Sequence, residues 1–413
     1  MTAALTTLFL AALALTTSMR LWLARRHVRH IAAHRDAVPK AFREAIALEA
    51  HQRAADYTTA RARLAMADVV TGSIFVLALT LGGLLQAMHD GWTTLGLGGL
   101  AHGLAFIAGL AVLSSVVDLP FSLYRTFVIE ARFGFNKMTL RLFLVDLAKG
   151  ALLGALIGLP VLAAVLWLME RMGDYWWLYV WLFWLGFNLL ALLIYPTVIA
   201  PLFNKFTPLA DAPLKERIES LLARCGFRSS GLFVMDGSKR SAHGNAYFTG
   251  FGRAKRIVFF DTLLEKLAPA EIEAVLAHEL GHYKHRHVWK RIGLLALASF
   301  AFLWLLGHLI DAPWFYEGLG MRSQGTAPAL VLFSLAIPAF TFPLSPLMSA
   351  LSRRHEYEAD AYAAEQTRAG DLVAALVKLY RDNAATLTPD PLYSTFYDSH
   401  PPAAARIARL QSA

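Results

Sequence analysis

The stretch AVLAHELGHYKHRHVWKR, from Ala274 to Arg291, decides the class of this protein when it is taken together with the residues that follow. It holds four histidines, a glutamate next to the first of them, and several basic residues. The next residues, IGLLALASFAFLWLLGHLI from Ile292 to Ile310, form an apolar run long enough to cross a bilayer as a helix. The stretch is therefore either a metal site at a membrane boundary or a His-rich basic collar that anchors a span.

The composition is that of a membrane protein with several spans and one sizeable water-exposed portion. Of the 413 residues, 56% are hydrophobic and 17% are charged, and the mean hydropathy is +0.46, whereas ordinary globular domains carry about 25% charged residues. The formal net charge is +9, but the basic residues flank apolar runs, so we expect membrane topology rather than a nucleic-acid partner. Cys225 is the only cysteine, which excludes an intramolecular disulfide and a cysteine-based zinc cluster.

Seven apolar runs have about the 17 to 25 residues that a helix needs to span hydrocarbon. The second run is short and broken by glycine, and the seventh contains four prolines, so we expect the seventh helix to be kinked or interrupted. The expected spans are Ala3–Leu23, Val69–Leu85, Leu97–Val117, Gly150–Met169, Tyr175–Tyr195, Ile292–Ile310 and Ala327–Ala350.

Basic residues concentrate in alternate connecting segments, which predicts the orientation of the spans. The loop from Arg25 to Ala67, the loop between the third and fourth spans, and the segment from Asn204 to Arg291 are rich in Lys and Arg, unlike the loops between them. The positive-inside rule then places the N-terminus outside and the His-rich stretch on the cytosolic side. No Lys or Arg precedes the first run, so we interpret it as a retained anchor rather than a cleaved signal peptide.

The segment between the fifth and sixth spans reads as a small α+β unit. A helix is expected over APLKERIESLLARCGF, from Ala212 to Phe227, and another over LAPAEIEAVLAHELGHYKHRH, which ends at His287. Short strands are expected at Gly231–Asp236, Asn245–Gly252 and Arg256–Asp261, with the turn Gly252–Lys255 joining the last two into a hairpin.

These elements predict an all-α multi-pass membrane protein that carries a small α+β domain, for which the motifs below indicate a zinc metalloprotease. We expect four parts: an N-terminal membrane region with five spans at residues 1–203, a cytosolic-side catalytic segment at 204–291, two further spans at 292–350, and a C-terminal catalytic segment at 351–413.

His278, Glu279 and His282 form the pattern HExxH. On a helix the two histidines lie on one face, about 6 Å apart along the axis, so both imidazoles can reach one zinc ion. The glutamate between them can take the proton of an attacking water. His285 lies about 10 Å along the axis from His278, too far to join the same ion, and we expect His285 and His287 to be basic residues at the membrane interface.

A third ligand is expected beyond the seventh span, in SRRHEYEADAYAAE from Ser352 to Glu365. Glu356 can bind a metal, and Asp360, one helical turn later, could accept a hydrogen bond from a ligand imidazole and fix its tautomer. The alternative is an acidic helix face turned to solvent, which is the usual place for such residues. The nearby HExxH pattern favours the metal.

The two motifs together resemble those of the type I CAAX prenyl endopeptidases, a family of integral-membrane zinc metalloproteases of the gluzincin type. Three further segments resemble this family, so the resemblance covers nearly the whole chain. They are LPFSLYRTFVIEARFGFNKMT (Leu119–Thr139), HGNAYFTGFGRAKRIVFFDTLL (His243–Leu264) and DPLYSTFYDSHPPAAARIARL (Asp390–Leu410).

The resemblance implies a ring of seven helices around an intramembrane chamber, one Zn²⁺ per chain, and a role for each matching residue. It makes His278, His282 and Glu356 the zinc ligands and Glu279 the catalytic base. It also implies that Asn245 binds the substrate backbone, that His400 steadies the oxyanion, and that Arg406 supports substrate binding. Without it, we would expect Asn245 in a turn, His400 on the surface and Arg406 as a helix-surface charge. The segment FTGFG departs from the family where a larger residue is expected at Thr249 or Gly250.

The function expected is therefore hydrolysis of a peptide bond near the C-terminus of prenylated CAAX substrates, which reach the protein from the lipid bilayer. One alternative is a quality-control zinc protease without prenyl specificity. The other is a multi-span transporter with an accidental HExxH, which the few ionisable residues within the spans argue against. The composition, rich in Ala and Leu with Arg over Lys, favours a bacterial cytoplasmic membrane; a eukaryotic host would imply the endoplasmic reticulum.

Overall fold

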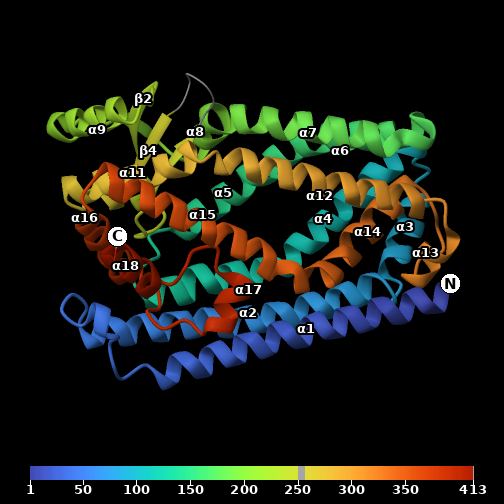
Figure 1. Cartoon of the computed structure of the whole chain (residues 1–413). Helices are drawn as coiled ribbons and strands as arrows, with labels where there is room; N and C mark the ends of the chain where they lie inside the picture. Colours follow the sequence, from blue (N-terminus) through green and yellow to red (C-terminus); the bar gives the residue numbers. More distant parts are fainter. Residues whose placement is uncertain (250–255, 413) are drawn as a thin grey trace.

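A computed structural model describes residues 1–249 and 256–412. Long helices run side by side through most of the molecule, with the N-terminus at one end and the small sheet, α11, α16 and the C-terminus at the other (Figure 1). In the described part of the chain seven helices are long and apolar enough to cross a membrane, which confirms the expected number of spans. They are Thr2–Ala33, Leu48–Leu79, Gly99–Glu130, Leu140–Arg171, Gly173–Phe203, His287–Leu309 and Thr326–Gln366.

The helices of the membrane region are α1 (Thr2–Ala33), α2 (Leu48–Leu79), α3 (Leu84–Thr93), α4 (Gly99–Tyr124), α5 (Leu140–Leu153), α6 (Leu159–Arg171), α7 (Trp176–Ile194), α8 (Ala200–Phe203), α12 (His287–Leu309), α13 (Pro313–Gly318) and α14 (Thr326–Thr341). The others are α9 (Ala212–Arg224), α10 (Asp261–Leu264), α11 (Pro269–Lys284), α15 (Ser345–Gln366), α16 (Ala369–Asp382), α17 (Pro391–Tyr397) and α18 (Ala403–Ser412). Turns of π-helix follow α4, α5 and α7.

The first two spans are longer than expected, and the second ends earlier. α1 continues to Ala33 and α2 begins at Leu48, so much of the segment predicted as a loop is helical. Charged residues exclude a segment from hydrocarbon but not from a helix, and Arg, Gln and Glu are good helix formers. The predicted end at Leu85 is wrong: α2 stops at Leu79, and Gly83, with a φ of 77°, turns the chain before α3.

The seventh membrane helix is interrupted, as its prolines predict. α14 ends at Thr341, a short 3₁₀ turn spans Phe342–Leu344, and α15 begins at Ser345. Pro343 lies in that turn, where its missing N–H cannot continue the helical hydrogen bonds. α15 then leaves the apolar region and carries the acidic motif toward α11.

The sheet has the order β1-β2-β4-β3 among the described residues, and its strands are β1 (Phe206–Pro208), β2 (Gly231–Met235), β3 (Ala246–Thr249) and β4 (Arg256–Phe260). β2 and β4 are parallel, whereas β3 pairs with β4 antiparallel, as the expected hairpin requires. The predicted turn Gly252–Lys255 lies outside the described residues. Within the described chain β3 is an outer strand, with one edge not paired to another strand.

α11 is the central element of the water-exposed unit, and most of its length is buried. Leu276, Ala277 and Leu280 pack in one apolar cluster with Ile257 and Phe259 of the sheet, and side chains of α9, α15 and α16 join the same cluster. Pro269 begins the helix, where its missing N–H costs no hydrogen bond. A helix covered on several sides in this way holds its remaining polar side chains in fixed positions.

Two of the three expected boundaries between parts fall inside helices: the boundary after residue 291 lies in α12 and the one after residue 350 lies in α15. The division into parts stays a prediction.

Candidate active site

Three potential metal ligands meet where α11 passes α15. His278 Nε2 lies 3.2 Å from His282 Nε2 and 3.5 Å from Glu356 Oε2, and His282 Nε2 lies 3.3 Å from Glu356 Oε1. Ligand atoms on a tetrahedral zinc with bonds of about 2.0–2.1 Å are about 3.3 Å apart. The three side chains, with one or the other oxygen of Glu356, thus have spacings of the size that one tetrahedral zinc requires. Their role as ligands stays a prediction.

The buried carboxylate of Glu356 supplies an independent test of this fit. The residue is 6% exposed, and its Oε2 atom is buried without a hydrogen-bond partner in the described part of the chain. Burying a carboxylate oxygen without a donor is costly, and a bound cation would remove that cost. The residues present thus fit a metal ion.

A second layer of charged side chains supports His278. Its Nδ1 atom lies 2.8 Å from Asp360 Oδ1, so Nδ1–H can donate to this carboxylate and Nε2 is the nitrogen left to bind a metal. That Asp360 fixes the tautomer of a metal-bound ring stays a prediction. Arg406 of α18 donates to both oxygens of Asp360, over 2.6 and 2.8 Å, and its Nη1 atom lies 3.7 Å from Glu356. Arg406 is 5% exposed, so it is not at the helix surface as the alternative expected, although it does pair with an acid.

These contacts change the proton affinity of His278. Burial lowers the pKa of its imidazole, but the hydrogen bonds to Asp360 and Glu356 outweigh burial and raise the pKa to about 9. The ring therefore holds a proton near neutral pH that a cation has to displace.

Glu279 and His400 lie next to these groups. Glu279 follows His278 on α11 and is half-buried, and its carboxylate makes no hydrogen bond or ion pair within the described residues. His400 Nε2 lies 3.4 Å from Glu356 Oε1, and its side chain is 60% exposed, while its Nδ1 atom lies 3.0 Å from Ser399 Oγ. The surrounding protein lowers the pKa of His400 by limiting its hydration, although Glu356 opposes the shift. Residue spacing could not bring His400 to the site, and only the family resemblance implied its place there.

Asn245 precedes β3 and is exposed. Its side-chain Oδ1 accepts a hydrogen bond from the Ala246 N–H over 2.8 Å, and its backbone carbonyl accepts one from Phe260 over 3.0 Å. The residue therefore stands at the start of the outer strand, and α11 packs against that strand. Its predicted contact with substrate stays a prediction, as does that of Arg406.

His287 differs from the expectation. The helix predicted to run through this residue ends at Lys284, and Arg286 adopts a left-handed backbone with a φ of 56°. His287 then begins α12, is 5% exposed and lies beside His282, so it is not a residue of an interfacial collar. Helical periodicity could not reveal this, because the direction change depends on Arg286. His285 is exposed, and its interfacial role stays a prediction.

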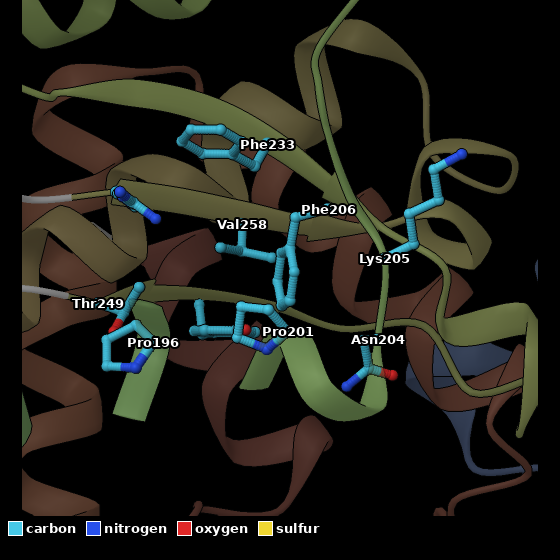
Figure 2. A pocket seen from close by; sticks show the side chains of 10 residues that line it. Pro196, Pro201, Asn204, Lys205, Phe206, Phe233, Thr249 and Val258 are labelled. Carbon is cyan, nitrogen blue, oxygen red and sulfur yellow. The ribbon is translucent and has the colours of Figure 1, made fainter. Parts of the chain in front are cut away.

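A pocket of about 430 Å³ lies on the face of the sheet turned away from α11. Figure 2 shows Pro196 and Pro201 on one side of it and Phe206, Phe233 and Val258 on the other. None of the three potential ligands lines it. The candidate site is therefore identified by the convergence of His278, His282 and Glu356, and not by this pocket. Gly250, where a departure from the family was noted, lies outside the described residues.

Comparisons with known proteins agree with this geometry. The family described as "CAAX prenyl protease N-terminal, five membrane helices" matches residues 27–205, and peptidase family M48 matches residues 208–413. The chain is 43% identical over 318 residues to a CAAX prenyl protease 1 homolog of Oryza sativa subsp. japonica, covering 76% of this chain and 74% of the relative. It is 41% identical over 328 residues to CAAX prenyl protease 1 of Saccharomyces cerevisiae, covering 75% and 72%.

A solved structure is also similar over almost the whole length. The crystal structure of S. mikatae Ste24p matches with a TM-score of 0.92 and 33% sequence identity, covering 98% of this chain and 99% of that chain. The sequence matches, the membrane helices and the converging His, His and Glu side chains agree with one another. The chain belongs to peptidase family M48, as a multi-pass membrane metalloprotease with the N-terminal five-helix region of the CAAX prenyl proteases.

Proposed function

We propose that this chain is a zinc endopeptidase that hydrolyses a peptide bond near the C-terminus of prenylated CAAX proteins. The observation that carries the zinc assignment is the convergence of His278 Nε2, His282 Nε2 and the Glu356 carboxylate: the two nitrogens are 3.2 Å apart, and each lies 3.3 to 3.5 Å from one of the two carboxylate oxygens. Two imidazoles and one carboxylate form a donor set typical of catalytic zinc, which leaves a fourth position open. The names of the relatives support the substrate class.

When bound, the zinc ion supplies Lewis-acid polarisation of the scissile carbonyl and of the attacking water. Glu279 stands beside this position without another partner among the described residues, so its carboxylate is free to take the proton of the water. The same residue then gives the proton to the leaving amine.

His400 is the candidate donor to the carbonyl oxygen that becomes negative during attack. A neutral ring with Nε2 carrying the proton can donate there, since Nδ1 faces the hydroxyl of Ser399. The exposed face of His400 leaves room for a peptide.

Substrate binding along β3 follows from the strand's position. An outer strand can pair with an extended peptide through backbone hydrogen bonds, and Asn245 stands at its start with its amide nitrogen available. Arg406 would act on the substrate indirectly, because its contacts are with Asp360 and Glu356. Thr249 lies at the far end of β3, where it would affect which substrate side chains are accepted.

A membrane location suits this substrate, because a prenyl chain holds the protein tail at the bilayer. The positive-inside pattern supports a catalytic site on the cytosolic side. The preference for a bacterial cytoplasmic membrane rests on composition alone, and the relatives named above come from eukaryotes. The partners proposed are thus the prenylated C-terminus and the lipid bilayer.

Cleavage of a farnesylated C-terminal peptide by the purified full-length protein tests the proposal. We expect the wild type to contain one zinc per chain and to cut, and Glu279→Gln to keep the zinc and lose activity by about 10²–10⁴-fold. Glu216→Gln, the same change on an exposed position of α9, is the matched control. Equal cutting of a peptide without the prenyl group would indicate a quality-control protease, and absence of both zinc and cutting would refute the enzyme.

A further inference from the structure

His287 is a buried histidine that touches one of the proposed ligands and has no part in the reaction described above. Its Nδ1 atom lies 3.0 Å from His282 Nδ1, and its Nε2 atom lies 2.9 Å from Glu358 Oε2. The three side chains therefore form a row from α11 through the start of α12 to α15.

The backbone between α11 and α12 places His287 next to His282. In an uninterrupted helix a residue five positions after His282 would point about 140° away from it. The helix instead ends at Lys284, and the left-handed backbone of Arg286 redirects the chain so that His287 returns to His282. A non-glycine residue rarely adopts this conformation, and it tends to persist where the surroundings demand it.

Only one arrangement of protons satisfies all three groups when both rings are neutral. The Nε2 atom of His282 faces His278 and Glu356, so it has to be the unprotonated, metal-binding atom. Its Nδ1–H then donates to Nδ1 of His287, and the Nε2–H of His287 donates to the Glu358 carboxylate. Each of the four ring nitrogens then has one role: two donate, one accepts, and one is left to bind the metal.

Neighbouring side chains hold His287 and Glu358 in place. The ring of His355 stacks on His287 with centroids 3.9 Å apart and planes 12° apart. Arg354 donates to the other oxygen of Glu358 over 3.0 Å, and Lys290 approaches the carboxylate at 3.9 Å. The carboxylate is thus fixed in direction, and so is the ring that it orients.

We propose that His287 and Glu358 are positioning residues that fix the tautomer and ring orientation of the ligand His282. They would do for His282 what Asp360 does directly for His278, with one imidazole inserted between ligand and carboxylate. The inference rests on the proposed zinc site and adds a determinant of metal affinity. Such outer partners change metal affinity by about 10–100-fold in other metal sites.

The test compares zinc affinity across variants of the full-length protein, measured by competition with a chromogenic chelator. His287→Phe keeps a flat ring against His355 but cannot accept the proton of His282, so we expect zinc to bind about 10–100-fold more weakly. His287→Asn places an amide oxygen near the position of Nδ1, and we expect it to recover part of the affinity. His308→Phe is the matched control, because His308 is exposed on the same helix and its side chain has a hydrogen bond only to Trp304 within the described part of the chain.

Two further readouts separate positioning from a merely structural role. We expect the visible absorption spectrum of the Co²⁺-loaded protein to shift in His287→Phe, and the unfolding temperature of the metal-free protein to stay near that of the wild type. Wild-type affinity and spectrum in His287→Phe would overturn the proposal. A second result would also overturn it: zinc affinity falls in His287→Phe, the unfolding temperature of the metal-free variant falls in proportion, and His287→Asn recovers none of the affinity.

The zinc content of the wild type separates a failure of the proposed zinc protease function from a failure of the positioning role of His287. A wild type without zinc overturns the proposed function together with the positioning role. A wild type that binds zinc and cuts, beside an unaffected His287→Phe, overturns the positioning role alone.

Discussion

A Cβ atom added to Gly281 would lie 2.8 Å from the Cα atom of Ala359 and 3.0 Å from its carbonyl oxygen. Real side chains do not approach a backbone so closely, so α11 and α15 touch at this point because residue 281 has no side chain. The contact lies between His278 and His282 on one helix and Glu356 and Asp360 on the other. It therefore sets the distance across which the proposed ligands meet.

Gly281→Ala should separate the two helices and weaken the metal site. The added methyl group meets backbone, which cannot rotate away, so we expect a loss of stability of about 1–3 kcal/mol and weaker zinc binding. Gly293→Ala is the control, because a Cβ at that exposed position of α12 would have no atom of another described element within 4 Å. Thermal unfolding and chelator competition measure both effects. Equal unfolding temperatures and equal zinc affinities in the two variants would show that the contact between α11 and α15 does not set the geometry of the metal site.

Arg406→Gln should destabilise the protein strongly. The arginine is buried and donates to both oxygens of Asp360, so its removal leaves a buried carboxylate without its main partner. Breaking a buried pair in this way costs about 3–5 kcal/mol. The exposed Arg409 of the same helix, which lies over the Tyr357 ring, provides the control Arg409→Gln. The unfolding temperature is the measurement, and similar values for both variants would contradict the prediction.

His400→Asn should slow the reaction without removing the metal. If the ring donates to the developing oxyanion, its loss lowers kcat by about 10²–10³-fold and changes KM little. Zinc content should remain that of the wild type, because the ring lies beside Glu356 and is not one of the three proposed ligands. Ser399→Ala, which removes only the hydroxyl next to Nδ1 of His400, should have a smaller effect on kcat. A variant with reduced zinc and unchanged turnover per bound zinc would refute this role.

Zinc affinity should depend on pH through His278. The pKa of this imidazole is raised to about 9 by Asp360 and Glu356, so binding displaces a proton at any lower pH. The apparent dissociation constant should rise about tenfold for each unit by which the pH falls from 8 to 6. Competition with a chelator of known pH dependence measures this slope. An affinity that stays constant across the range would contradict a protonated His278.

The raised pKa of His278 also determines how the stability of the metal-free protein changes with pH. Because the pKa of His278 is above its ordinary value of 6.5 in the folded state, protonation of this ring stabilises the fold. The stabilisation is fully present below about pH 6.5 and is lost as the pH rises toward 9. The measurement is the unfolding temperature of the metal-free protein at pH 6 and at pH 9. From His278 we expect the higher temperature at pH 6.

Local spacing was enough to predict the proposed ligands and the general architecture. His278 and His282 stand four residues apart on a helix, and so do Glu356 and Asp360, so each pair shares a face whatever the rest of the chain does. The number of spans depended only on the length of apolar runs, and Pro343 marked the interruption of the last one. These features are local, because a helical turn or a missing N–H is set by neighbouring residues.

The sequence by itself thus determined a multi-pass membrane fold with an HExxH helix and an acidic partner motif. Only the tertiary structure decided which side chains support the ligands: the close approach at Gly281, the pairing of Arg406 with Asp360, and the return of His287 to His282 through Arg286. Each of these depends on contacts between different elements or on one unusual backbone angle. A periodic pattern carries no information about either, because it describes one regular element at a time.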